Sequence, residues 1–393
     1  MSSSKVFALW EVLRVSLRLG LTSFGGPIAH LGYFHDEYIR RRKWMDEQIY
    51  SELVALCQFL PGPASSQVGI GVGIIRAGLL GGFIGWLGFT LPSVIALVLF
   101  AFLLQGFDVE NAGWIHGLKI VAVAIVAQAI LGMGLKLTPD RERVTIAVAA
   151  AAVTLLWQTA YTQVLLIVAA GLLGLWLYKK RPNAVGQSIH IAIGKPFALC
   201  SLLLFFVLLI ALPLFRQLWN FEWLAMFDSF YRSGALVFGG GHVMLPLLER
   251  EIMPQGWVSQ ADFLAGYGAA QAVPGPLFTF AAYLGAMAGG IVGAVVATIA
   301  VFLPAFLLVV GALPFWNDLR SNPRVQGALI GINAAVVGIL LAALYDPLWM
   351  TAILSPLDFT LALFLFILLV FWKCPPWIVV LTGALGGLII GNI

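Results

Sequence analysis

The chain has 393 residues, of which 61% are hydrophobic and only 10% are charged. An ordinary globular domain carries about a quarter charged residues, so this composition excludes a soluble fold and predicts a protein that lies in a lipid bilayer. The net charge of +4 is explained by Lys and Arg in cytoplasmic loops and does not predict nucleic-acid binding. The three cysteines form no CxxC pair, so neither a disulfide framework nor a metal site is expected.

Apolar segments recur along the whole chain. Most hold about 18 to 25 residues, enough to cross roughly 30 Å of hydrocarbon as a helix. They lie at 7–31, 50–75, 79–104, 113–136, 144–158, 161–178, 196–215, 223–248, 263–288, 289–312, 325–345, 357–372 and 375–392. Because some need not span, we expect an all-α polytopic membrane protein with about 10 to 13 membrane segments.

A polar stretch, Lys179–Lys195, interrupts this pattern in the middle of the chain. It predicts a boundary between two halves. The predicted division is 1–178 for a first repeat, 179–222 for a linker plus one extra membrane helix, and 223–393 for a second repeat.

Helix breakers interrupt the first two apolar segments, as SFGGPIAHLG and LPGPASSQ. The basic run Arg40–Lys43 would lie outside the cell in a simple zigzag, against the tendency of Lys and Arg to stay in cytoplasmic loops. Two broken or re-entrant helices would return this run to the cytoplasmic face, and Gly and Pro at these positions permit such breaks.

The two halves share motifs at an offset of about 214 residues. The pattern R-x-G-x3-F-G-G occurs at Arg18–Gly26 and Arg232–Gly240, and Q-x2-P-G-P occurs at Gln58–Pro63 and Gln271–Pro276. The extra segment after the linker predicts that the second half is inserted in the opposite orientation. Inverted repeats with broken helices at matched places are a transporter arrangement, in which the substrate binds near the midplane.

Arginine stands inside a membrane segment at two matched positions, Arg18 and Arg232. Glu11 and Arg14 lie on the same helical stripe as Arg18, and Asp228 precedes Arg232 by one turn. These arginines could hold an oxyanion through their fork-shaped donors, with the neighbouring charges as ion pairs or proton relays. They could equally form structural ion pairs, Arg14 or Arg18 with Glu11 and Arg232 with Asp228, or snorkel to the interface.

The FGG and PGP motifs free backbone N–H groups and start new half-helices, whose positive ends favour anions. The residues that could line such a substrate site are Gly25, Gly26, Gly62, Gly239, Gly240, Gly275, Gln58, Gln271, Ser65 and Ser66. Thr279, after the second PGP, is a weaker candidate, so the first half has the more polar lining. The alternative is that these Gly and Pro residues only kink helices and allow close packing.

Two histidines follow the FGG motifs but do not occupy matched positions. His30 and His242 could relay protons, although a packed and hydrogen-bonded histidine is the expected state of each. The matched loops also carry charges that we expect to be solvated, among them Asp36, Glu37, Glu249, Arg250 and Glu251.

Neither a GxxxxGK[ST] loop nor an HExxH motif is present, and no cofactor is expected. A membrane-embedded enzyme or lipid flippase would need a catalytic carboxylate or histidine pair at membrane depth, and the chain offers only unmatched candidates. We therefore expect a transporter, rather than an enzyme, that draws on an ion or substrate gradient.

The pairing of FGGPIAHLG with QFLPGPASSQ, and of FGGGH with QAVPGP, resembles the chromate ion transporter (CHR) superfamily in its long, two-domain form. The resemblance covers nearly the whole chain. It implies a multi-pass protein of the inner (plasma) membrane, with antiparallel halves, that exports chromate and confers chromate resistance. Sulfate is the alternative substrate, because both ions are tetrahedral divalent oxyanions. The partners expected are thus chromate or sulfate and the lipid bilayer, and a homo-oligomer is compatible with the sequence.

Overall fold

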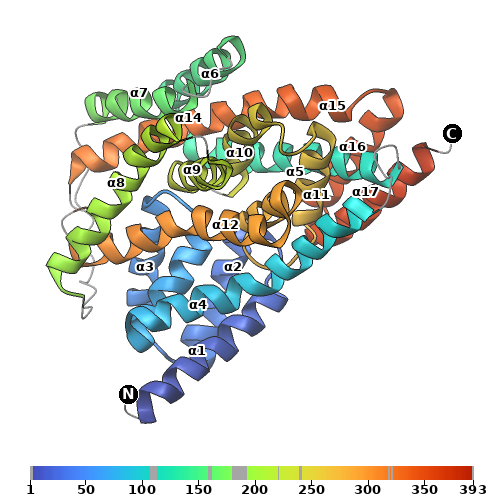
Figure 1. Ribbon diagram of the computed structural model, residues 1–393. Helices are drawn as coiled ribbons and strands as arrows, with labels where there is room; N and C mark the ends of the chain where they lie inside the picture. Colours follow the sequence, from blue (N-terminus) through green and yellow to red (C-terminus); the bar gives the residue numbers. More distant parts are fainter. Residues whose placement is uncertain are drawn as a thin grey trace.

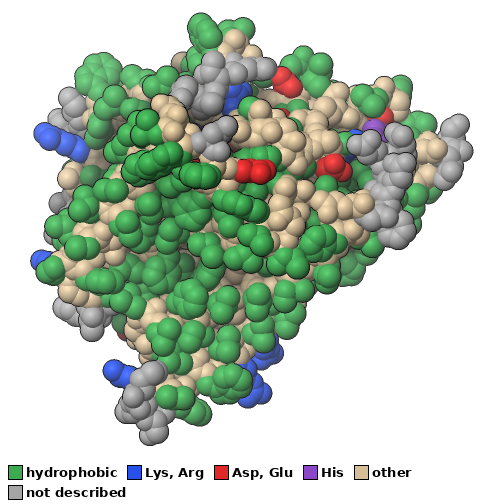
Figure 2. All heavy atoms as spheres, in the orientation of Figure 1, with side chains coloured by type: hydrophobic (Ala, Val, Ile, Leu, Met, Phe, Trp, Pro, Cys, Tyr) green, Lys and Arg blue, Asp and Glu red, His purple; other side chains and the backbone are tan. Residues whose placement is uncertain are grey.

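The computed structural model describes residues 3–106, 113–157, 162–178, 193–219, 221–238, 241–316, 319 and 322–391. Every regular element in these ranges is helical, and five of the helices there are long and apolar enough to cross a membrane. Hydrophobic side chains cover most of the face in Figure 2, while Lys and Arg gather toward its edges. The chain is therefore an all-α polytopic membrane protein, as its composition predicts.

The two halves have the same order of helices (Figure 1). The first half contains α1 (Ser3–Thr22), α2 (Gly26–Phe34), a π-helical turn (His35–Arg41), α3 (Glu47–Phe59), α4 (Ala64–Gly106), α5 (Gly113–Leu137), α6 (Arg141–Leu156) and α7 (Thr162–Leu177). The second contains α9 (Glu222–Ala235), α10 (Met244–Ile252), α11 (Gln260–Ala270), α12 (Phe280–Ala312), α14 (Pro323–Ala343), a π-helical turn (Leu344–Trp349), α15 (Met350–Ala352), α16 (Pro356–Val370) and α17 (Pro376–Ile390). The predicted repeat is thus confirmed.

One helix, α8 (Lys195–Leu218), stands between the halves and packs against α9 and α12. It corresponds to the predicted extra segment. Residues 179–192 of the predicted linker lie outside the described residues, so the boundaries proposed for the two repeats stay a prediction.

The helices break where the glycine motifs stand. Gly25 and Gly26 separate α1 from α2 with φ angles of 93° and 76°. Gly62 and Gly275 lie in the two PGP loops with φ angles of 115° and 105°. Residues with a Cβ rarely adopt such angles, and this explains why glycine marks each break.

Each half also contains a tight hairpin within what reads as one long apolar helix. In α4 the helix is interrupted at Ala77 and Gly78, and the backbone of Gly73 then packs against that of Gly81. The two arms therefore run antiparallel. The same bend occurs at 289–290 in α12, and both bends coincide with segment boundaries expected from the sequence.

The C-terminal hairpins of the two halves are exchanged. Helix α5 of the first half packs on α16 and α17 of the second, whereas α14 of the second half packs on α6 and α7 of the first (Figure 1). Gly117 lies against the backbone of Gly383 in one crossing, and Gly331 lies against Ala170 in the other. These contacts occupy matched repeat positions, and small residues let the helix backbones approach closely.

Candidate functional site

The PGP loop of each half is hydrogen-bonded to the other half. The Gly62 N–H donates to the Val237 carbonyl at 2.7 Å, and the Gly275 N–H donates to the Ser23 carbonyl at 2.9 Å. Ser23 and Val237 each directly precede the phenylalanine of an FGG motif. The paired contacts relate the halves by an approximate twofold axis, as in a self-complementary dimer interface. We call this region, in which both motifs of both halves meet, the motif crossing.

Space at the motif crossing is restricted in both halves. A Cβ added to Gly275 would lie 2.5 Å from Ser93 Oγ on α4, and one added to Gly62 would lie 3.1 Å from Gln67 Nε2. Ala305 of α12, close to the repeat position of Ser93, also lies beside Gly62. Helices α4 and α12, which pack on one another, thus frame the crossing from opposite halves.

Several buried polar groups gather beside Gly275 without a hydrogen-bond partner among the described residues. They are Ser23 Oγ, Thr90 Oγ1 and Gln271 Nε2. The contacts that place them there are the Gly275–Ser23 backbone bond and the close approach of the Phe89 carbonyl to Gly275. The ring of Phe89, next to Thr90, packs on His30 at 5.4 Å. Buried polar groups are almost always paired, so this concentration points to a ligand or water site.

The PGP loop around Gly62 has a smaller set of such groups. Ser66 Oγ and Gln67 Oε1 are buried and have no partner in the described part of the chain, whereas Gln67 Nε2 donates to the Pro61 carbonyl at 2.7 Å. Ser65 is buried at the start of the same helix. Among the described residues, the first half supplies Ser23, Ser66, Gln67 and Thr90 to this set and the second half supplies Gln271.

The two histidines differ. His242 Nδ1 lies 2.8 Å from the Tyr267 hydroxyl, so it is packed and hydrogen-bonded as expected. His30 is more buried than His242 and packs between the rings of Phe34 and Phe89, so its packing is confirmed, while its hydrogen bond stays a prediction.

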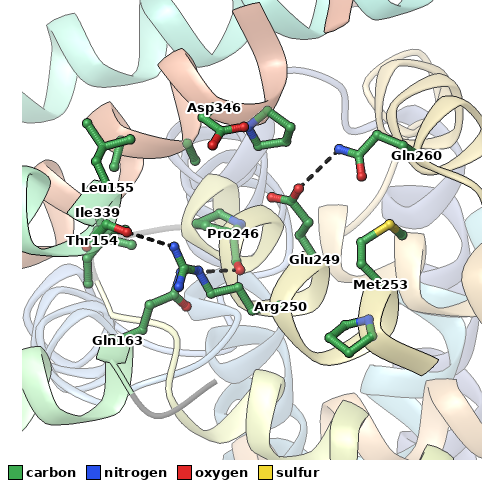
Figure 3. A pocket seen from close by; sticks show the side chains of 14 residues that line it. Thr154, Leu155, Gln163, Pro246, Glu249, Arg250, Met253, Gln260, Ile339 and Asp346 are labelled. Carbon is green, nitrogen blue, oxygen red and sulfur yellow. Dashed lines mark hydrogen bonds between the residues drawn. The ribbon is translucent and has the colours of Figure 1, made fainter. Parts of the chain in front are cut away.

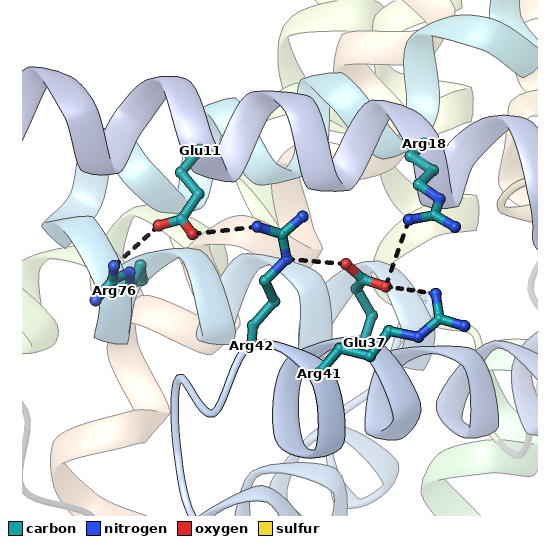
Figure 4. Close-up of polar contacts among 6 residues, drawn as sticks. All are labelled: Glu11, Arg18, Glu37, Arg41, Arg42 and Arg76. Atoms are coloured by element: carbon teal, nitrogen blue, oxygen red, sulfur yellow. Dashed lines mark hydrogen bonds and ion pairs between the residues drawn. The ribbon is translucent and has the colours of Figure 1, made fainter.

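The first-half cluster joins α1 to the π-helical turn that follows α2 and to α4 (Figure 4). It consists of Glu11, Arg18, Glu37, Arg41, Arg42 and Arg76. The buried Glu37 faces Arg42 at 3.0 Å, Arg41 at 3.2 Å and Arg18 at 3.9 Å. Four arginines share two carboxylates, which leaves an excess of positive charge, and the side chain of Arg18 is 59% exposed.

The second-half cluster occupies the matched place and is more enclosed. Arg232 donates to both oxygens of the fully buried Asp228, at 2.9 and 2.8 Å, and to Glu251 at 2.7 Å. Arg216 from α8 lies 3.3 Å from Asp228 and also donates to Ser229. Two arginines here face two carboxylates.

Each of the two matched arginines therefore also contacts a glutamate that the sequence analysis did not assign to it. Glu37 and Glu251 are separated by the same 214 residues as Arg18 and Arg232, a signal that could have found them. The expectation that these glutamates are solvated is wrong, because α2 and α10 fold them back onto α1 and α9. The pairing of Arg232 with Asp228 is confirmed.

Other predicted positions lie away from these groups. Glu11 pairs with Arg42 and Arg76 rather than with Arg14 or Arg18, and Arg14 is exposed with no ion pair in the described ranges. Gln58 is exposed at the end of α3. The predicted glycines 239 and 240 lie outside the described residues.

A model of the chromate transporter family matches residues 10–175 and again residues 224–388. The two matches repeat the two halves and together cover most of the chain. The chain belongs to the chromate transporter family. This is a family of transporters and not a class of enzymes.

Curated relatives match over most of this chain and most of their own length. The chain is 28% identical to a chromate transport protein of Pseudomonas aeruginosa over 86% of its own length and 80% of the relative. It is 30% identical to a probable chromate transport protein of Synechococcus elongatus, over 86% of this chain and 84% of that protein. An uncharacterized transporter of Methanocaldococcus jannaschii is 26% identical over 83% of this chain and 81% of its own. No solved structure matches the chain.

Proposed function

We propose that this chain is a secondary active transporter that exports chromate from the cytoplasm across the inner membrane and so confers chromate resistance. The observation that carries the proposal is the motif crossing, where loops from both halves meet and leave buried polar groups without partners. Relatives from Pseudomonas aeruginosa and Cupriavidus metallidurans that match most of the chain are named chromate transport proteins.

The crossing has the chemistry that a divalent oxyanion requires. Hydroxyl and amide groups from Ser23, Ser66, Thr90 and Gln271 donate hydrogen bonds to oxygen. Helix α4 begins directly after the first PGP motif, so the positive end of its dipole adds to them. Donors of this kind stabilise an anion without a fixed counter-charge, which allows the anion to leave again.

The first-half cluster would collect the anion before it enters. Its excess of arginine, next to the basic run 40–43, raises the local concentration of anions. The tendency of such runs to lie in the cytoplasm supports a cytoplasmic position for this cluster, the side from which an exporter takes up chromate.

The approximate twofold relation between the halves supplies the conformational step. If the halves are inserted antiparallel, rocking one against the other around the crossing exposes it alternately to each side of the membrane. The exchanged hairpins hold the two halves together. In this proposal the backbone therefore changes conformation in the loops of the motif crossing.

Transport itself is tested in everted membrane vesicles that contain the protein. Labelled chromate should accumulate under an imposed gradient, and vesicles without the protein provide the control. No accumulation under any gradient would contradict the proposal. If excess sulfate abolishes chromate uptake and labelled sulfate accumulates faster, the oxyanion alternative replaces chromate.

The site is tested by Thr90→Val, which removes an unpaired buried hydroxyl at nearly constant volume. If this hydroxyl had only a structural role, its removal would leave the free energy of unfolding unchanged or raise it by up to about 1–3 kcal/mol. We expect thermal stability to be kept while chromate uptake falls about tenfold or more, as for the loss of one substrate hydrogen bond. Thr360→Val on α16, where the exposed hydroxyl donates to the Pro356 carbonyl, is the matched control.

A further inference from the structure

A pocket of about 260 Å³ lies where the exchanged hairpin α6–α7 meets the second half (Figure 3). Thr154 and Gln163 line it from the first half. Glu249 and Arg250 line it from α10, and Asp346 lines it from the turn after α14. The pocket is separate from the motif crossing, and none of its residues is a candidate in the motif analysis above.

The charges of the pocket suit a cation better than an oxyanion. Two carboxylates, Glu249 and Asp346, face one guanidinium, and Arg250 also donates to the Thr154 carbonyl at 3.0 Å. The side chain that contacts Glu249 from α11, Gln260, is uncharged, as are Thr154 and Gln163, which line the same pocket from the first half. The negative charge of Asp346 disfavours ionisation of Glu249, so a proton on Glu249 relieves the repulsion between the two carboxylates.

Gln260 Nε2 donates to Glu249 Oε1 at 3.1 Å, which fixes the carboxyl group in the pocket, although this donor by itself favours the ionised form. Thr154 Oγ1, also lining the pocket, is buried and has no hydrogen-bond partner among the described residues. Helix α10 is not one of the membrane-crossing helices. Burial, aided by the negative charge of Asp346, raises the pKa of Glu249 to about 7.

The pocket is mechanically connected to the transport motifs. Helix α10 begins just after the second FGG motif and is only nine residues long. Gln163 Nε2 donates to the Pro246 carbonyl in this helix at 3.3 Å. A small adjoining pocket shares Gln163 and Arg250 and reaches Arg232 and Glu251 of the second-half cluster. A change of charge on Glu249 therefore acts on the helix that positions the FGG loop.

We propose that this pocket is a proton-binding site and that proton exchange at Glu249 is coupled to movement of the anion. The inference rests on the function proposed above and adds the coupling ion to it. The repeat position of Glu249 in the first half is occupied by His35, which lies 2.7 Å from the exposed Glu47, so the titrating carboxyl group has no counterpart there.

The test uses the full-length protein in liposomes that enclose a pH-sensitive dye. Glu249→Gln keeps the shape and the acceptor for Gln260 but does not titrate. The wild type should acidify or alkalinise the lumen when chromate is added, and its uptake should change between about pH 6 and pH 8. In Glu249→Gln the chromate-driven pH change should fall about tenfold or more, and uptake should become independent of pH.

Two further variants serve as controls. Glu222→Gln, at an exposed glutamate in the first turn of α9, should behave as the wild type. Glu249→Asp should restore a pH-dependent step, which separates loss of the carboxyl group from misfolding. A Glu249→Gln protein that keeps the wild-type pH profile and proton flux overturns this inference alone. A wild type that moves no chromate at any pH contradicts the proposed function instead.

Discussion

The two ion-pair clusters occupy matched places in the repeat but differ in burial and balance. In the second half, Asp228 is fully buried and two arginines face two carboxylates. In the first half, four arginines share two carboxylates and Arg18 is largely exposed. A duplicated framework has therefore given one half a closed structural anchor and the other an open, positively charged surface. Sequence symmetry alone does not imply equal roles for Arg18 and Arg232.

The largest expected effect concerns this difference in burial. Arg232→Ala leaves the buried Asp228 with only the longer contact to Arg216, and removing one partner of a buried ion pair costs about 3–5 kcal/mol. Arg18→Ala leaves Glu37 bound by Arg41 and Arg42 and should cost about 0–1 kcal/mol. Thermal unfolding of both variants in detergent measures the contrast. Equal losses of stability would show that the clusters do not differ as described.

The next largest effect concerns Glu249, which lies beside the second-half cluster and occupies the repeat position of His35 in the first half. The pKa of Glu249 is raised from 4.5 to about 7, so below pH 4.5 it contributes nothing to stability because both states are protonated. As the pH rises to about 7 the unfolded state ionises first, and the wild type should lose up to about 3 kcal/mol relative to Glu249→Gln. Stability curves of both proteins against pH measure this. Parallel curves would place Glu249 in water, like the exposed Glu47 that pairs with His35.

The smallest effect concerns the first-half cluster, which is the more exposed of the two. Arg41→Gln removes one of the surplus charges while Arg42 still holds Glu37. We expect the apparent KM for chromate to rise about three- to tenfold at low ionic strength, and this difference should fade near 0.15 M salt as the charges are screened. Initial uptake rates at two salt concentrations provide the measurement. A change in the maximal rate with an unchanged KM would move Arg41 from anion capture to the transport step.

The helix breaks and the repeat were predictable because their signals are local. Glycine and proline mark the points where helices end, and the hairpin bends at 77–78 and 289–290 fall between apolar segments of ordinary length. From the sequence, the motif crossing could be predicted only as a region where the FGG and PGP motifs of both halves come together. That each PGP loop binds the opposite half depends on distant contacts that no periodicity encodes.

The charged residues show where sequence interpretation fails. Glu249 reads as a loop charge, since its burial is produced by α6 and α7, which lie about 90 residues earlier in the chain. The exchanged hairpins left a trace in the spacing of small residues, such as Gly113 with Gly117 and Gly383 with Gly387. Such spacing predicts close helix contacts but does not identify the partner helix.

The exchange of hairpins has a consequence for how the protein is made. During synthesis α5 enters the membrane long before α16 and α17, so its glycine face gains this neighbour only after most of the second half has been made. The first half therefore does not reach its final packing as an independent unit, unlike domains that fold in order of synthesis. The contact of α14 with α6 and α7 forms first, and the contact of α17 with α5 completes the exchange.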